Sequence, residues 1–136
     1  MREAILFLLR EPINMENKIE YIEEDDYLIR NFHGIFHIDE IVESWKYLIE
    51  NKLQEKEYTG VLNNFCDADL KMQLDDLEQL LGLFKKHMHT FKNLKLAVVM
   101  TTPENIIFPY FAKTTSRFKI EAFTTVEAAK NWLQAK

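Results

Sequence analysis

Short runs of alternating or continuous hydrophobic residues are separated along this chain by longer segments in which hydrophobic residues recur every three or four positions. The first pattern predicts β-strands and the second predicts amphipathic α-helices. The predicted strands span residues 19–22, 27–33, 58–62, 94–100 and 118–123. The predicted helices span residues 41–53, 74–90, a segment that begins at 102, and 124–133.

Local residue chemistry sets the ends of the predicted strands. Four consecutive acidic residues at 23–26 repel one another and prefer water, which predicts a hairpin turn between the first two strands. Gly34 is expected to end the second strand. The segment 94–100 is almost entirely apolar after Lys95, which is typical of a central strand that is buried on both faces.

The predicted helices carry start signals and apolar stripes. Thr102 and Pro103 are typical of a helix cap followed by the first helical position, and Pro109 is expected to kink that helix or to restart it. Thr124 and Glu127 have the spacing of a capping box at the start of the final helix. The stripe of the first helix is Ile41, Val42, Trp45, Leu48, Ile49 and Leu53, and that of the second is Leu74, Leu77, Leu80, Leu81, Phe84, Met88 and Phe91.

The element order is therefore β-β-α-β-α-β-α-β-α, which predicts an α/β fold in a single domain. Strands that alternate with helices need parallel crossovers, whereas the first two strands form a hairpin, so we expect a mixed β-sheet of about five strands. A chain of 136 residues is close to the commonest size of one domain.

The N-terminal segment, residues 1–14, is predicted to lie outside the core of this domain, which spans 15–136. Residues 4–9 are apolar and lie between Arg2 and Arg10, as in a signal peptide, but such cores have roughly 7–15 residues. We therefore expect an N-terminal extension, or a start assigned too far upstream, rather than a targeting segment.

The composition narrows the classes of partner. Hydrophobic residues make up 47% of the chain and charged residues 29%, the balance of a globular protein. The net charge of −5 disfavours nucleic acid and anionic membrane surfaces as partners. Cys66 is the single cysteine, so no disulfide can form within the chain, which fits a reducing cytoplasm. No apolar run approaches the ~20 residues of a membrane-spanning helix.

Cys66 is a candidate nucleophile, because a helix N-terminus can lower the pKa of a thiol. The carboxylates of Asp67 and Asp69 are close to it in sequence and oppose a thiolate. A small, buried, apolar cysteine is therefore the favoured interpretation.

The four histidines are candidates for a metal site. His87 and His89 are two positions apart on a predicted helix and so do not share a face, and Gly34 separates His33 from His37. No spacing matches a zinc site, and the sequence has no glycine-rich phosphate loop or serine-hydrolase motif. We therefore expect no catalytic residues, no metal, no cofactor and no enzymatic activity.

The closing segment, residues 123–133, reads Phe-Thr-Thr-x-Glu-Ala-Ala-x-x-Trp-Leu. Together with the late apolar strand and the Thr-Pro helix start, it resembles the STAS/SpoIIAA-like superfamily, in particular the small stand-alone bacterial SpoIIAA-like or STAS/SEC14-like proteins. The resemblance covers about residues 18–134 and implies a mixed sheet with helices mainly on one face. It also implies a regulatory role, because some relatives are partner-switching anti-sigma-factor antagonists, and others have been compared with lipid carriers. A different mixed α/β sandwich with the same elements is the alternative fold.

The sequence departs from the antagonists at one motif. Those proteins carry an Asp-Ser-Ser-Gly-like segment after the third strand, in which a serine is phosphorylated. The matching segment here, residues 63–69, contains no serine or threonine. No phosphoacceptor can be carried over, and a phosphorylation switch of that kind is not expected.

A ligand or partner groove is predicted beyond the carboxyl ends of the parallel strands, between loops at 63–69 and 101–105. The dense apolar segment 106–111 lies beside it, and its residues are expected either to pack onto the sheet or to line the groove. The candidate groove residues are Asn63, Asn64, Phe65, Cys66, Asp67, Thr101, Thr102, Phe108 and Tyr110.

Two functions are consistent with these patterns. The first is a non-catalytic binding or regulatory module that acts through a protein partner or as a homodimer. The second is a carrier or sensor of a small apolar or amphipathic, lipid-like ligand. An acidic chain with no catalytic motif favours the first.

Overall fold

The computed structural model describes residues 3–7, 17–102, 107–115 and 117–135. The strands are β1 (Glu3–Phe7), β2 (Lys18–Glu23), β3 (Tyr27–His37), β4 (Gly60–Lys71), β5 (Lys95–Val99) and β6 (Lys119–Phe123). The helices are α1 (Ile38–Asn51), a 3₁₀ turn η1 (Leu74–Asp76), α2 (Leu77–Lys86), α3 (Met88–Phe91), α4 (Ile107–Thr115) and α5 (Val126–Gln134).

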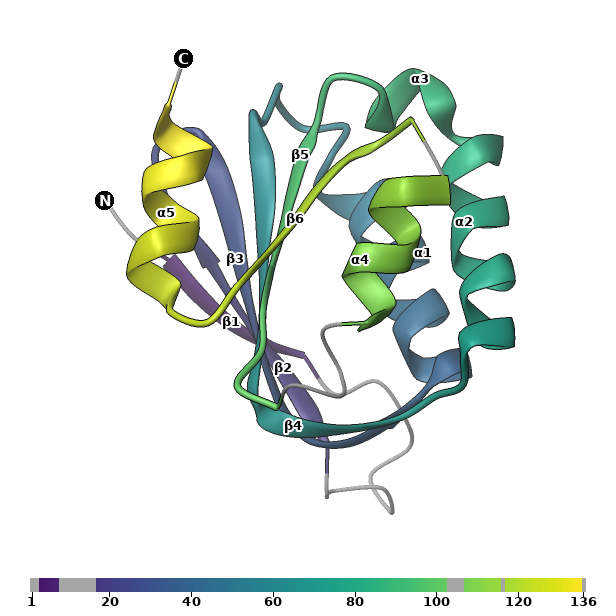
Figure 1. Cartoon of the computed structure of the whole chain (residues 1–136). Helices are drawn as coiled ribbons and strands as arrows, with labels where there is room; N and C mark the ends of the chain where they lie inside the picture. The colour runs from purple at the N-terminus through teal and green to yellow at the C-terminus, as the bar shows by residue number, and fades with distance from the viewer. Residues whose placement is uncertain (1–2, 8–16, 103–106, 116, 136) are drawn as a thin grey trace.

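The strands form one mixed sheet in the order β1-β2-β3-β4-β5-β6. Antiparallel pairing joins β1, β2 and β3, whereas β3, β4, β5 and β6 are parallel to one another. Figure 1 shows α1, α2, α3 and α4 on one side of the sheet and α5 on the other. The prediction of a single α/β domain with a mixed sheet and helices mainly on one face is therefore confirmed.

The strand that the sequence analysis missed is β1. It lies within residues 1–14 and pairs with β2 along the outer edge of the sheet, from Glu3 opposite Glu23 to Phe7 opposite Ile19. The described sheet thus has six strands rather than about five. The domain boundary after residue 14 stays a prediction.

Two strands are longer than predicted. Gly34 takes a left-handed φ of 107° but does not end β3, which continues to His37. The predicted loop at 63–69 is wrong, because these residues continue β4, with one extra residue bulged between Asn64 and Asp67. The two extensions pair with each other, so their backbone groups are satisfied by ladder hydrogen bonds rather than by turns.

The helix ends also differ from the predicted ones. The helix predicted at 74–90 is divided into η1, α2 and α3, with a break at His87, whose φ and ψ are −113° and 36°. The cap of α5 is Thr125, whose Oγ1 accepts a hydrogen bond from the Ala128 N–H at 3.1 Å, so the predicted capping box that began at Thr124 is wrong.

The start of α4 was predicted at Thr102 and Pro103, and Pro103 lies outside the described residues. The described helix begins at Ile107. Pro109 falls in its first turn, where the missing N–H of proline has no helical acceptor and costs nothing.

Two apolar clusters hold the layers together, one on each face of the sheet. The larger lies under α1, α2 and α4, and its aromatic centre joins Trp45, Phe84 and Phe91, with ring centroids 4.4–5.5 Å apart. The smaller lies under α5, where the absence of a side chain at Gly60 is required. A Cβ there would lie 2.4 Å from Leu133 Cδ2 and 2.6 Å from the Lys95 carbonyl oxygen.

A buried carboxylate fixes the junction between β3 and α1. Glu40 Oε1 accepts a hydrogen bond from the His37 N–H at 2.7 Å, and Oε2 accepts one from Asn17 Nδ2 at 2.7 Å. The same Asn17 amide also donates to the Ile35 carbonyl at 2.8 Å. Burial raises the pKa of Glu40, but the hydrogen bonds from His37 and Asn17 outweigh this and hold its pKa below the ordinary value.

This carboxylate predicts a pH dependence of stability. Because the pKa of Glu40 is lower in the folded state, its contribution is present above the unfolded-state pKa of about 4.3 and is lost as the pH falls through the folded-state pKa. We expect the wild type to be more stable than Glu40→Gln at neutral pH, with the difference narrowing in acid. Urea unfolding over about pH 3 to 7 measures this, and a difference that stays constant over that range would contradict it.

Candidate functional site

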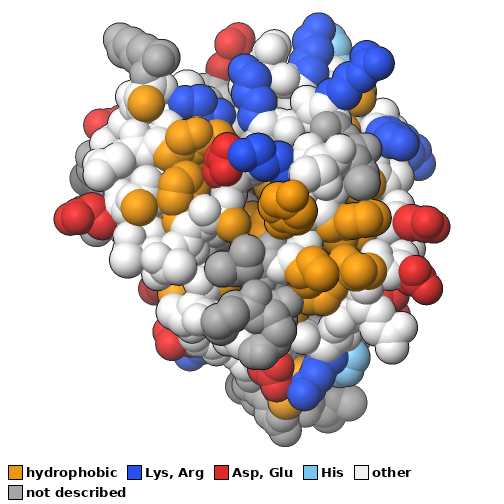
Figure 2. Space-filling model, viewed as in Figure 1, with side chains coloured by type: hydrophobic (Ala, Val, Ile, Leu, Met, Phe, Trp, Pro, Cys, Tyr) orange, Lys and Arg blue, Asp and Glu red, His pale blue; other side chains and the backbone are white. Residues whose placement is uncertain are grey.

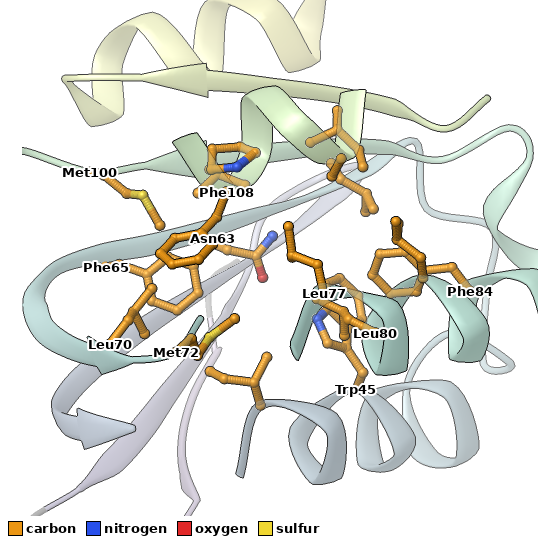
Figure 3. Close-up of a pocket in the computed structure, with 17 residues that line it drawn as sticks. Trp45, Asn63, Phe65, Leu70, Met72, Leu77, Leu80, Phe84, Met100 and Phe108 are labelled. Atoms are coloured by element: carbon orange, nitrogen blue, oxygen red, sulfur yellow. The ribbon is translucent and has the colours of Figure 1, made fainter. Parts of the chain in front are cut away.

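A hydrophobic cavity of about 80 Å³ lies between the sheet and helices α1, α2 and α4 (Figure 3). The side chains labelled in Figure 3 converge on it from the sheet and from the helices that cover this face. Its lining is Ile41, Trp45, Asn63, Phe65, Leu70, Met72, Leu77, Leu80, Leu81, Phe84, Leu96, Val98, Met100, Phe108, Pro109, Ala112 and Ile120.

The lining is hydrophobic at every position except Asn63. The cavity has roughly half the volume of the engineered 150 Å³ cavity that stays dry and holds one benzene molecule. As it stands, it can therefore hold one small apolar group but no lipid chain.

Asn63, the polar residue of the cavity wall, is hydrogen-bonded to a buried arginine. Arg30 is fully buried, and its Nε donates to Asn63 Oδ1 at 2.9 Å while Nη1 donates to Ser44 Oγ at 3.0 Å. Asn63 Nδ2 in turn donates to the Ala97 carbonyl at 3.1 Å. The Arg30 guanidinium carbon lies 4.1 Å from the ring centroid of Trp45. Arg30 therefore positions two walls of the cavity, Asn63 and Trp45.

No carboxylate of the described residues lies within 4.0 Å of Arg30, so the described groups that contact its guanidinium are neutral. Burial lowers the pKa of Arg30, and the neighbouring Tyr21 hydroxyl opposes that shift. The Arg30 guanidinium, with its amide, hydroxyl and aromatic neighbours, therefore has a structural role, because its hydrogen bonds fix the positions of the side chains around it.

The structure separates the candidate groove residues. Asn63, Phe65 and Phe108 line the cavity. Because β4 continues as a strand, alternation places Asn64 and Cys66 on the opposite face. There, Asn64 Nδ2 donates to Asn31 Oδ1 at 2.9 Å, and Cys66 packs beside the smaller cluster.

The remaining candidates lie at the surface. Asp67 is exposed, with its Oδ2 3.8 Å from His33 Nδ1. Thr101 and Thr102 are exposed and do not line the cavity, and residues 103–105 of the predicted loop lie outside the described residues. Tyr110 is 63% exposed on α4. The 63–69 side of the predicted groove is therefore a strand rather than a loop, and the described candidates divide among the cavity, the opposite face of the sheet and the surface.

Exposed apolar side chains lie on the same helix that closes the cavity. Ile107, Tyr110 and Phe111 are 47%, 63% and 38% exposed, and we call these three residues the α4 surface. Figure 2 shows hydrophobic side chains gathered over α4 and α2 in the centre and right of the view.

The side chains with reactive potential do not converge. Burial, and then the charge of Asp67, raise the pKa of the Cys66 thiol, so it stays protonated at neutral pH. Within the described part of the chain, no three His, Cys, Asp or Glu side chains are grouped so that they could hold a metal ion.

Sequence reasoning missed the cavity walls that the helices supply. Trp45, Leu77, Leu80, Leu81 and Phe84 all belong to the predicted stripes, which we assigned to the core. The stripes identified which helix faces are buried. The space between them depends on how three elements pack, which periodicity does not encode.

Comparison with known proteins shows which known fold the structure resembles. No family model and no curated protein matches the chain. Among solved structures, an uncharacterized DUF3478-family protein with a SpoIIAA-like fold, from Shewanella loihica PV-4, matches with a TM-score of 0.55 and 16% identity, over 98% of this chain and 95% of its own. An anti-sigma factor antagonist from Mycobacterium paratuberculosis matches with a TM-score of 0.60 and 14% identity, over 93% of this chain and 100% of its own.

Of the helices described, none has both the length and the apolar character needed to cross a membrane. The two structural matches extend over nearly all of both chains, which places the present sheet and helices in one known architecture. The chain therefore has a SpoIIAA-like fold.

Proposed function

We propose that this protein is a non-catalytic regulatory module that binds a protein partner through the α4 surface. The observation that carries the proposal is the exposure of three large apolar side chains, Ile107, Tyr110 and Phe111, on a nine-residue helix. Single exposed apolar residues are normal, whereas adjacent ones on one helix indicate an interaction site. Aromatic side chains of this kind are enriched among the residues that dominate binding energy.

Two further observations support this proposal. The similarity of fold to an anti-sigma factor antagonist is consistent with binding through a protein partner. The segment 63–69 has no serine or threonine and runs along β4, so the partner would be held without phosphorylation at that segment. A chain with a single cysteine is compatible with the cytoplasm as the place of action.

The experiment compares what the wild type and a Tyr110→Ala variant retain from the native host. We expect one protein that the wild type retains and the variant loses by about tenfold or more, as for a hot-spot residue. Lys46→Ala, on the exposed side of α1, is the matched control and should retain the partner. Equal recovery by all three chains, or no protein recovered by any, would overturn the proposal.

A small apolar ligand in the cavity is the second candidate function. The observation that favours it is a lining that is hydrophobic at every position but Asn63. The volume of about 80 Å³ admits a group smaller than benzene, and a lipid-like chain would require α2 and α4 to separate. Native mass spectrometry of the protein from its host, before and after solvent extraction, tests this. A mass that does not change on extraction would reject a bound ligand.

A further inference from the structure

We infer that a second copy of this chain packs antiparallel along the outer side of α2, across a two-fold axis between Leu81 and Gly82. This inference goes beyond the proposed function, because it uses α2 rather than the α4 surface. Three observations support it. A glycine in α2 has open space beside it, exposed residues line one side of the segment, and the acids at the start of α2 would face the bases at its end in an antiparallel copy.

Gly82 lies inside α2, is exposed, and is not required by the fold of the single chain. A Cβ built there would meet nothing within 4 Å. Glycine in the interior of a helix is destabilising relative to alanine. The open space beside Gly82 lets the backbone of another helix approach closely, which is how glycine is used at helix crossings.

Three residues of α2 next to this glycine, Glu78, Leu81 and Lys85, are spaced by three and four positions, which places them on one side of the helix. Glu78 and Lys85 are exposed, and Leu81 is half-buried and also contacts the cavity. Leu74 in η1 and Met88 in α3, each 38% exposed, lie just before and just after this helix. We call Leu74, Glu78, Leu81, Lys85 and Met88 the α2 seam.

The charges of the α2 seam are symmetric about a point between Leu81 and Gly82, which is equally far from Glu78 and Lys85. In an antiparallel pair of identical helices centred there, each Glu78 meets Lys85 of the second copy. Leu74 and Met88 flank α2 at its two ends, so Leu74 of one copy lies near Met88 of the other. A two-fold interface requires this kind of self-complementary surface.

The charges of the seam are available for such pairing. Within the part of the chain that the structure describes, neither Glu78 nor Lys85 has an ion-pair partner within 4.0 Å. Asp75 and Lys86 continue the same order, with acids at the start of the helix and bases at its end.

A second copy fits this order better than other occupants do. An anionic membrane would attract Lys85 and Lys86 but repel Asp75 and Glu78. A different protein would need basic residues opposite Glu78 and acidic residues opposite Lys85. An antiparallel copy of the same helix supplies both. Binding of a membrane or of a different protein is an outcome that the experiment below can reveal.

The first test is a charge exchange, read by sedimentation equilibrium of the full chain. We expect the wild type to form a dimer, and Glu78→Lys or Lys85→Glu alone to weaken it about tenfold or more, because two attractive pairs become repulsive. An equimolar mixture of the two variants should restore dimers, since each new lysine then meets a new glutamate. Glu43→Lys on the exposed side of α1 is the matched control and should leave the dimer unchanged.

The second test is covalent and does not depend on affinity. In a Cys66→Ser background, Gly82→Cys should form an inter-chain disulfide on mild oxidation, because the two copies cross beside this position. Gln79→Cys, which is exposed but off the seam, should form little. Circular dichroism verifies that each variant is folded.

Three results would overturn the inference. They are a wild type that stays monomeric throughout the concentration range, a dimer indifferent to both charge reversals, and equal cross-linking at 79 and 82. If the wild type stays monomeric and sediments with anionic vesicles while Lys85→Glu does not, the seam is a membrane contact instead. The Tyr110→Ala variant should still dimerise, so the α4 surface and the α2 seam are tested independently.

Discussion

Replacing Arg30 with alanine is expected to lower the free energy of unfolding by about 3–5 kcal/mol. The substitution leaves a cavity against Trp45 and removes the donor that satisfies Asn63 Oδ1 and Ser44 Oγ. An unsatisfied buried polar atom alone costs roughly 1–3 kcal/mol. A domain of this size has a total stability of about 5–15 kcal/mol, so the loss is a large fraction of it.

A paired substitution separates the charge from the packing. Arg30→Met with Asn63→Leu removes both the guanidinium and the group it satisfies while it keeps most of the volume. Because buried charges are often replaceable by apolar groups of similar size, we expect this double variant to stay within about 2 kcal/mol of the wild type. Urea unfolding at neutral pH measures both variants. A loss below about 1 kcal/mol for Arg30→Ala would mean that the buried network contributes little.

Phe84→Ala is expected to cost about 3–5 kcal/mol and to enlarge the cavity. The Phe84 ring is 3% exposed and packs 5.1 Å from the Trp45 centroid, 4.4 Å from that of Phe91 and 5.6 Å from that of Phe118. It also forms part of the cavity wall. Its removal should therefore join the lost volume to the existing space.

The enlarged cavity gives this prediction a second measurement. Benzene should raise the thermal midpoint of Phe84→Ala and leave that of the wild type unchanged, since a ligand stabilises only the folded state that binds it. Leu83→Ala is the matched control, because Leu83 is half-buried on the same helix and does not line the cavity. It should lose less stability and gain none from benzene. An unchanged midpoint for Phe84→Ala with benzene would mean that the helices collapse into the space.

The sequence patterns predicted the described fold well where one periodicity dominates. The alternation around Ile19 and Tyr21 and the apolar run from Leu94 to Met100 indicated strands that the structure contains. The prediction failed where local chemistry and long-range pairing disagree. Asn63, Asn64 and Asp67 favour turns, but pairing with β3 extends β4 through all of them.

The candidate site was predictable only in part. Phe65 and Phe108 were selected because they lie near strand ends, and both line the cavity. Asn64 and Cys66 were placed with them on the assumption of a loop, and a strand sends them to the other face. Arg30 was not singled out at all, because nothing in a strand sequence distinguishes a buried arginine from an exposed one.

The paired extensions of β3 and β4 have a consequence for how the cavity is supported. Beyond the last partners of β2 and β5, the sheet narrows to a two-stranded ribbon that joins residues 34–37 to 68–71. The helix α1 follows one strand of this ribbon directly, and α2 follows the other after a short turn. Two walls of the cavity are thus attached to one narrow support, while the α4 wall is anchored between β5 and β6. A twist of that ribbon would therefore move α1 and α2 together relative to α4.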